Sequence, residues 1–307
     1  MLKKTQRTIL FLLGPTATGK TDIVINLCDN FSNTFEIISV DSVQIYKDCN
    51  VGSGKPDDAI LKRYHHHLIN HIDLKDTYNV ARFVLDTTSL IDQIFERGNI
   101  PILVGGTMMY FNSLLKGITA LPGRNTTLRE ELEQLDTKEL FHILQEECFK
   151  TSRSINSNDR LRIIRAIELN RENPFSAKSI IKLDDTLRVI LIGISPRLRS
   201  SLHEKIAIRQ PYLANDELIN EAEHLLAKYQ IAEHPIRKAV NYRQAFDLIE
   251  GLINNNEFYK KTLFATRQLA KRQITWIRSW EDLNIFDINK YKDTNKHRCI
   301  YVCKSII

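Results

Sequence analysis

The chain has 307 residues, a formal net charge of +6 and a pI near 9.0, and 43% of its residues are hydrophobic. No apolar run reaches the roughly 18–20 residues that span a bilayer, and the five cysteines form no CxxC pair, which excludes a bundle of membrane helices and a cysteine-rich zinc site. The apolar run before residue 14 is too short for a signal peptide. These properties predict a cytoplasmic protein with no membrane segment. Because nothing in the pattern indicates an extended interface, we expect a monomer.

Short apolar segments alternate with helical segments in the first third of the chain. Buried strands are predicted at residues 8–13, 35–40 and 100–104. Helices are predicted at residues 19–28, 79–99 and 107–117. Strands that alternate with helices predict an α/β fold, in which a parallel sheet carries helices on both faces.

The pattern changes after residue 118. Residues 119–186 contain three helical segments with no strand between them, and LRVILIGI at 187–194 returns to strand character. We therefore predict a helical insertion, residues 119–186, within a core domain made of residues 1–118 and 187–307. Most of the chain after residue 195 reads as helix, while LNIFDI and RCIYVCKSII remain open between strand and short helix.

GPTATGKT at residues 14–21 matches the phosphate-loop (P-loop) pattern G-x-x-x-x-G-K-[ST] between a predicted strand and a predicted helix. Its glycines permit a tight turn in which backbone N–H groups and the helix N-terminus converge on an anion. Lys20 is expected to reach the distal phosphate oxygens, and the hydroxyl of Thr21 to bind Mg²⁺. The predicted phosphate-binding residues are Gly14, Pro15, Thr16, Ala17, Thr18, Gly19, Lys20 and Thr21.

A P-loop NTPase usually places a Walker-B carboxylate at the end of an apolar strand to hold Mg²⁺. Here the strand at 100–104 runs into Gly105-Gly106-Thr107 without an acid, and the carboxylate at a strand end is Asp41. Ligands bind outside the carboxyl ends of strands in open α/β sheets, so Asp41 is expected beside the phosphate loop. It is a candidate general base; the alternative is a carboxylate that only caps the following turn with Ser42.

Five segments, in content and order, resemble the tRNA dimethylallyltransferases, also called IPP transferases. They are GPTATGKT, DSVQIYKDCNVGSGKP (41–56), HHLIN (66–70), GGTMMYFNSLLKG (105–117) and ATRQLAKRQITWIR (265–278). The DSxQxY segment followed by G-[ST]-x-K-P is far more specific than the phosphate loop. The resemblance covers most of the chain and is weakest in the insertion and near the C-terminus.

The resemblance implies transfer of a dimethylallyl group from dimethylallyl diphosphate to N6 of adenosine 37 in tRNA, with release of diphosphate. The loop would hold the leaving group, with Mg²⁺ as cofactor, and no phosphoryl group would be transferred. Asp41 would accept the proton of the exocyclic amine, because that amine is a poor nucleophile. Thr107 matches a family residue near the reacting centre, although it also fits a plain helix N-cap. Arg209 matches a diphosphate contact; without the resemblance it reads as a solvated helix charge.

The tRNA would be held by basic residues. Residues 258–280 carry six Lys or Arg and no acid, and Leu263, Ala270, Ile274 and Ile277 supply an apolar side. The insertion is implied to bind the anticodon stem-loop, and Gln44 to pair with the edge of an adenine that has flipped out of its stack. The residues implied to contact tRNA are Asp41, Ser42, Val43, Gln44, Thr107, Arg129, Arg162, Arg165, Arg237, Arg243, Arg267, Lys271, Arg272 and Arg278.

Two departures from the family pattern bear on these contacts. The chain has Asn156-Ser157 where the family usually has His-Pro, and Asn241-Tyr242 where it has Gly-Tyr. Asn tolerates positive φ better than other non-glycine residues, so we expect the second turn to survive. The run His65-His66-His67 is not expected to bind a metal, because consecutive histidines do not all face one ion.

Other functions remain open. A small-molecule kinase would also use a P-loop, but the absent strand-end acid and the basic C-terminal helix count against it. A non-catalytic RNA-binding module could retain a loop that has lost its function. A prenyl transferase could also act on free adenine nucleotides, although the basic insertion favours a polymeric substrate.

Overall fold

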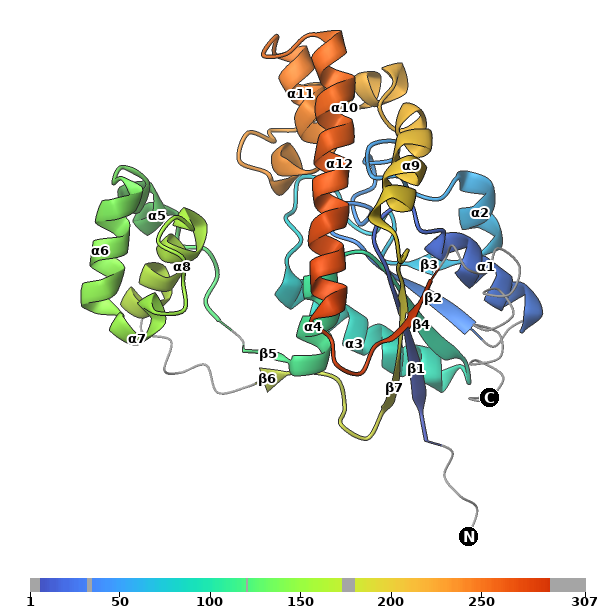
Figure 1. The fold of residues 1–307 in the computed structure, drawn as a ribbon. Coiled ribbons are helices and arrows are strands. Elements are labelled where there is room, and N and C mark those ends of the chain that lie inside the picture. Colours follow the sequence, from blue (N-terminus) through green and yellow to red (C-terminus); the bar gives the residue numbers. More distant parts are fainter. Residues whose placement is uncertain (1–5, 32–34, 120, 173–179, 288–307) are drawn as a thin grey trace. The chain divides into compact units, whose positions relative to one another are not determined.

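The computed structural model describes residues 6–31, 35–119, 121–172 and 180–287. The chain divides into two compact units (Figure 1). The core unit consists of Met1–Lys116 and Lys182–Ile307, and the inserted unit of Gly117–Ile181. The predicted segment RCIYVCKSII lies outside the described residues.

The core unit is built on a six-stranded sheet with the order β3-β2-β4-β1-β7-β8, in which every pairing is parallel. The strands are β1 (Thr8–Leu13), β2 (Phe35–Val40), β3 (His66–His67), β4 (Ile100–Gly105), β7 (Arg188–Ile194) and β8 (Asn284–Phe286). The α/β fold class and the four longer strands are therefore confirmed. Strand β8 resolves the ambiguous LNIFDI segment, and the short edge strand β3 was not predicted.

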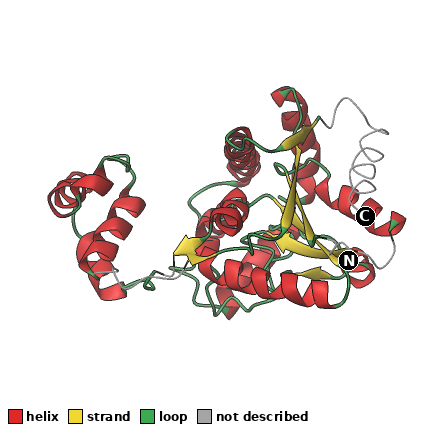
Figure 2. Ribbon diagram, turned by 90° about the horizontal axis from the view of Figure 1, so that it is seen from below, coloured by secondary structure: helices red, strands yellow, loops and turns green. Residues whose placement is uncertain are grey.

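Helices flank the sheet (Figure 2). The helices of the core unit are α1 (Lys20–Asn30), α2 (Asp58–Arg63), α3 (Val80–Glu96), α4 (Met108–Lys116), α9 (Arg199–Arg209), α10 (Asp216–Lys228), α11 (Tyr242–Ile249) and α12 (Asn255–Arg278). Two 3₁₀ turns, Gln210–Tyr212 and Pro235–Lys238, lie among the last four helices. No helix in the described part of the chain is long and apolar enough to cross a membrane.

The core forms because apolar residues line both faces of strands that are covered by helices. Leu10 and Leu12 of β1, Ile102 of β4 and Ile192 of β7 form one buried cluster with the apolar face of α1. Burial of both sheet faces explains why these strands read as near-continuous apolar runs. The polar residues that follow the strands are therefore gathered at the carboxyl edge of the sheet.

The inserted unit is mainly helical. Its helices are α5 (Thr126–Glu133), α6 (Thr137–Glu147), α7 (Phe149–Ser152) and α8 (Arg160–Arg171). They enclose a separate core made of Leu132, Leu140, Leu144, Ile163, Ile164 and Ile167. A short antiparallel pair, β5 (Ile118–Thr119) with β6 (Ile180–Ile181), joins the two ends of the unit and was not predicted.

The turn before α11 has the positive φ that the sequence predicted. Asn241 adopts φ 73°, and its side chain adds bonds that a glycine cannot make. Its amide donates to the carbonyl of Gly52 at 2.9 Å and accepts from the amide of Gln210 at 3.1 Å. The asparagine therefore links α11 to the loop that follows β2.

We expect Gly105→Ala to destabilise the protein. A Cβ at this position would lie 2.1 Å from the carbonyl oxygen of Val40, a backbone atom that cannot move aside easily. The expected loss of unfolding free energy is about 2 kcal/mol, within the range for overpacked sites. Denaturant unfolding of the full chain measures it. Gly123→Ala is the matched control, because its Cβ would meet nothing within 4 Å; equal stability of the two variants would contradict the prediction.

Candidate functional site

A cavity of about 1300 Å³ opens in the core unit at the carboxyl edge of the sheet. Its lining includes the phosphate loop from Thr16 to Thr21, the segment from Asp41 to Gln44, Gly105 to Thr107, and Arg209. In an open α/β sheet, ligands bind at this edge. The cavity therefore brings together the predicted catalytic residues and most of the predicted phosphate-binding residues; Gly14 and Pro15 are not among its lining.

The phosphate loop joins β1 to α1 through a tight turn. Ala17 and Gly19 have φ values of 61° and 74°, a conformation that costs an alanine more than a glycine. Gly14 is required for space, since a Cβ there would lie 2.6 Å from the carbonyl oxygen of Ile194 in β7. Helix α1 begins at Lys20, so its unpaired N-terminal N–H groups are directed to an anion-binding position.

Lys20 and Arg209 place two partly buried cations at the loop. The Lys20 ammonium donates to the carbonyl of Pro15 at 2.7 Å. Burial, and then the charge of Arg209, lower its pKa to about 7, while Asp41 opposes the shift. Burial also lowers the pKa of Arg209. A bound anion would offset both effects, so the electrostatics favour an anionic ligand here.

Arg209 lies between two loops rather than in solvent. Its guanidinium donates to the hydroxyl of Thr16 at 3.0 Å and to the carbonyl of Gly54 at 3.3 Å. A Cβ on Gly54 would lie 2.4 Å from the guanidinium, so the glycine makes this approach possible. The arginine at the C-terminal end of α9 therefore reaches the phosphate loop, and the contact with a diphosphate that the resemblance implied stays a prediction.

Asp41 caps the turn that follows β2. Its Oδ1 accepts from the N–H groups of Val43 at 2.8 Å and Gln44 at 3.1 Å. Burial raises its pKa, although the two N–H groups and Lys20 partly oppose this. A carboxylate with a raised pKa is a stronger base, and the capping bonds fix its orientation. The capping role and a catalytic role are therefore compatible.

Thr107 and Gln44 lie in the same cavity, but their contacts differ. The N–H of Thr107 donates to the carbonyl of Val40 at 3.3 Å, which holds the threonine beside the end of β2 as α4 begins. The amide of Gln44 donates to the carbonyls of Ser53 and Gly54, each at 3.3 Å. The amide expected to pair with an adenine therefore also supports the 53–54 loop in this structure.

Two residues that support the loops of the site were missed by the sequence analysis. Glu221 of α10 accepts from the N–H groups of Asn50, Val51 and Gly52 at 2.9, 2.8 and 3.2 Å, and so fixes the loop after β2. Gln273 of α12 bonds to two loops of the cavity. The sequence contains one signal for Gln273: helical spacing places this polar residue on the apolar side of α12 with Ala270 and Ile277.

The predicted tRNA contacts of the core unit occupy different environments. Lys271, Arg272 and Arg278 are exposed on α12, and Arg272 also lines the cavity. Arg267 is half-buried, and Arg243 lies 3.9 Å from Asp247. Arg237 pairs with Glu250 at 2.7 Å and stacks on Phe246. Arg237 therefore attaches its turn to α11, whereas α12 presents accessible cations.

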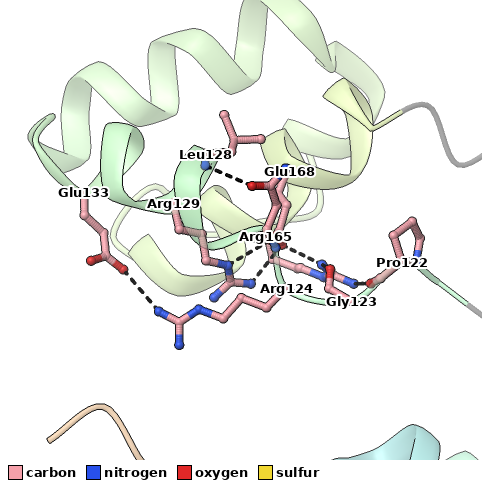
Figure 3. Close-up of polar contacts among 9 residues, drawn as sticks. Pro122, Gly123, Arg124, Leu128, Arg129, Glu133, Arg165 and Glu168 are labelled. Atoms are coloured by element: carbon pink, nitrogen blue, oxygen red, sulfur yellow. Dashed lines mark hydrogen bonds and ion pairs between the residues drawn. The ribbon is translucent and has the colours of Figure 1, made fainter.

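In the inserted unit, two of the three predicted arginines surround a buried glutamate (Figure 3). Glu168 has a fully buried side chain and accepts from Arg129 at 2.9 and 3.0 Å, from Arg165 at 2.5 Å and from the N–H of Asn125 at 2.6 Å. Arg165 also donates to the carbonyls of Pro122 and Gly123. Burial would raise the pKa of Glu168, but the guanidinium groups hold it at about 2.

Arg162 differs from this pair because 73% of its side chain is exposed. Arg129 and Arg165 therefore attach the segment before α5 to α8, while Arg162 faces solvent beside Asp159. Arg129 and Arg165 therefore stabilise the fold of the inserted unit, in addition to any contact with RNA.

Removing Glu168 should destabilise the inserted unit. Glu168→Ala leaves two guanidinium groups and an N–H without their shared acceptor, and such losses cost about 3–5 kcal/mol. Glu133→Ala is the matched control, because Glu133 is exposed and lies 4.0 Å from Arg124. Limited proteolysis within residues 117–181, followed by mass spectrometry, measures the local opening. Equal cleavage rates in the two variants would contradict the role of Glu168.

Comparison with known proteins gives one consistent result. The family model described as IPP transferase matches residues 44–280. The tRNA dimethylallyltransferase of Legionella pneumophila, strain Paris, is 37% identical over an alignment of 289 residues, and the match covers 92% of each chain. The tRNA isopentenylpyrophosphate transferase of Bacillus halodurans has a TM-score of 0.72 and 27% identity, covering 98% of this chain and 96% of that one. The tRNA delta(2)-isopentenylpyrophosphate transferase of Staphylococcus epidermidis has a TM-score of 0.68 and 26% identity, and the match covers 97% of this chain and 100% of that one.

Proposed function

Because the chain belongs to the IPP transferase family, we propose that it transfers a dimethylallyl group from dimethylallyl diphosphate to N6 of adenosine 37 in tRNA. The observation that carries the proposal is the shared cavity, which holds an anion-binding loop, two partly buried cations and a carboxylate of raised pKa. The family match begins at Gln44, so the assignments of the loop and Asp41 rest on the loop motif and on the geometry of the cavity.

The diphosphate would lie on the phosphate loop. The N–H groups at the start of α1 and the Lys20 ammonium supply donors, and Arg209 supplies a second positive charge. These groups act on negative charge that grows on the diphosphate as the allylic C–O bond breaks. The loop therefore binds a leaving group, and no phosphoryl transfer is needed.

A magnesium ion fits the residues present. The Thr21 side chain lines the cavity beside Lys20, and no cluster of three or more His, Cys, Asp or Glu side chains exists among the described residues. Mg²⁺ commonly takes one or two protein ligands and binds substrate phosphates and water otherwise. Bound there, it would neutralise charge on the diphosphate.

Asp41 would act as the general base. As the bond from N6 to the allylic carbon forms and the C–O bond breaks, the N6 proton passes to the carboxylate, and the electron pair of the C–O bond leaves with the diphosphate. The capping N–H groups of Val43 and Gln44 hold Oδ1 in place during this step. Thr107, in the same cavity, would contact the reacting group.

The exposed cations of α12 would bind the tRNA backbone, and the target base would flip into the cavity. Arg237, Arg243 and Arg267 of the core unit, and Arg129, Arg162 and Arg165 of the inserted unit, complete the proposed set of contacts with the anticodon stem-loop. We assign the protein to the cytoplasm as a monomer, on the sequence arguments given above. A kinase is disfavoured because β4 ends at Gly105 and is followed by Gly106 without an acid, and because the relatives are prenyl transferases in name.

Incubation with unmodified tRNA, Mg²⁺ and dimethylallyl diphosphate should add one five-carbon group to an anticodon-loop adenosine, detected by mass spectrometry. Asp41→Asn should lower kcat by about 10²–10⁴-fold, the usual contribution of a general base. Asp92→Asn, an exposed acid on α3, is the matched control and should retain wild-type rates. A near-normal rate in Asp41→Asn would remove Asp41 from the mechanism. Phosphoryl transfer or hydrolysis of γ-labelled ATP would instead support the kinase.

The reaction rate should depend on pH through Asp41. A base must be ionised, so activity falls as pH decreases through its pKa, and burial raises that pKa above the ordinary 3.8. The acid limb of kcat/KM for tRNA should therefore lie above the pH expected for an exposed aspartate. The residual activity of Asp41→Asn should lack this limb. The same acid limb in both proteins would assign it to another group.

A further inference from the structure

Gln273 is a polar residue in the buried stripe of α12. The rest of the stripe consists of Phe258, Thr262, Thr266, Ala270 and Ile277, and only 7% of Gln273 is exposed. A buried amide lowers stability unless its donor and acceptor groups are bonded. Both groups of Gln273 are bonded, and both partners belong to loops of the cavity.

The amide connects the phosphate loop to the loop between β4 and α4. Its Oε1 accepts from the N–H of Thr16 at 2.9 Å, and its Nε2 donates to the carbonyl of Gly106 at 2.9 Å. At this length only a glutamine offers an uncharged acceptor and donor together: glutamate lacks the donor, lysine the acceptor and methionine both. A glutamine is therefore the residue type suited to this position, which must accept from one N–H and donate to one carbonyl.

Gly106 is shaped to receive this bridge. A Cβ at Gly106 would lie 2.4 Å from Nε2 of Gln273, so any other residue would push the amide away. Gly106 does not have a positive φ, and its requirement is space rather than backbone freedom. The close approach of Gln273 therefore explains why the second residue of the Gly105-Gly106 pair is a glycine.

Thr16 is held from two helices. Gln273 of α12 binds its N–H, while Arg209 of α9 donates to its hydroxyl at 3.0 Å. The two helices pack together through Leu202, Ile206 and Ala270, and Ala17 of the loop packs against this cluster. The first half of the loop is therefore fixed by two helices far away in the sequence.

We propose that Gln273 is a positioning residue that sets the separation between the diphosphate loop and the segment that carries Thr107. The assignment rests on the proposed function, which places the leaving group on one loop and the reacting adenosine beside the other. Gln273 also uses the Thr16 N–H, so the amide donors for the anion come from the later residues of the loop. A misplacement of about 1 Å between reacting groups can lower a rate about 10²-fold, so this bridge should affect kcat.

The test compares Gln273→Met with wild type. Methionine keeps the volume and removes both hydrogen bonds, so kcat should fall about 10- to 100-fold. The KM for tRNA should change less than about threefold, since the cations of α12 are untouched. Thr275→Ala is the matched control: Thr275 is exposed on the same helix, and its hydroxyl donates to the carbonyl of Lys271 at 3.1 Å. It should behave as wild type.

Gln273→Glu supplies a second readout, which also decides the matter if Gln273→Met does not fold. A protonated carboxyl both donates and accepts, as the amide does, whereas a carboxylate cannot donate. The ratio of kcat in this variant to kcat in wild type should therefore rise as pH is lowered from about 8.5 to about 6.

A ratio independent of pH, or a wild-type kcat in a folded Gln273→Met protein, would overturn the positioning role. Failure of wild type to modify tRNA would instead overturn the proposed function, so the two failures are distinguishable.

Discussion

The confinement of positive charge at the carboxyl edge of the sheet is the constraint on which the site depends. Lys20 and Arg209 are both partly buried, and burial lowers the pKa of each. Both line the cavity and are partly covered by the surrounding loops and helices, so a bound anion that displaces water from the cavity interacts with them at a lower effective dielectric than in bulk water. This arrangement favours a ligand with concentrated negative charge, which a diphosphate provides. The attraction between these cations and the ligand also becomes stronger as negative charge develops on a leaving group. Contacts of this kind accelerate a reaction because they are stronger in the transition state than in the ground state.

Close backbone approaches make this confinement possible. Gly14 lies against the carbonyl of Ile194, Gly54 against Arg209, and Gly106 against Gln273. Each glycine lacks the Cβ that would separate two neighbouring segments. The side chains of Arg209 in α9 and Gln273 in α12 occupy two of these close approaches. Helices that follow β7 in the sequence therefore hold the phosphate loop, which lies near the N-terminus. Glu221 supports the loop after β2 in the same way.

The inserted unit shows a different use of buried charge. Glu168 is fully buried, and its carboxylate is shared by two guanidinium groups and one backbone N–H. Such a group is tolerated only because its partners are complete. The arrangement ties the segment before α5 to α8 and leaves Arg162 free to face solvent. Two arginines of one helix therefore have different roles: Arg165 organises the unit, and Arg162 presents its charge to solvent.

The sequence alone determined the α/β class, the four longer strands, the phosphate loop and the strand-end position of Asp41, because these depend on local apolar runs and on a motif of fixed spacing. It also predicted the positive-φ turn at Asn241, a local property of the backbone. Only the tertiary structure decided that Arg209 bonds to the phosphate loop, that Gln44 also supports the 53–54 loop, and that Gln273 joins two loops. Those contacts link residues more than 150 positions apart in the case of Arg209 and Gln273. No periodicity within one segment reports such pairings, because they arise only when distant elements are packed against the same edge of the sheet.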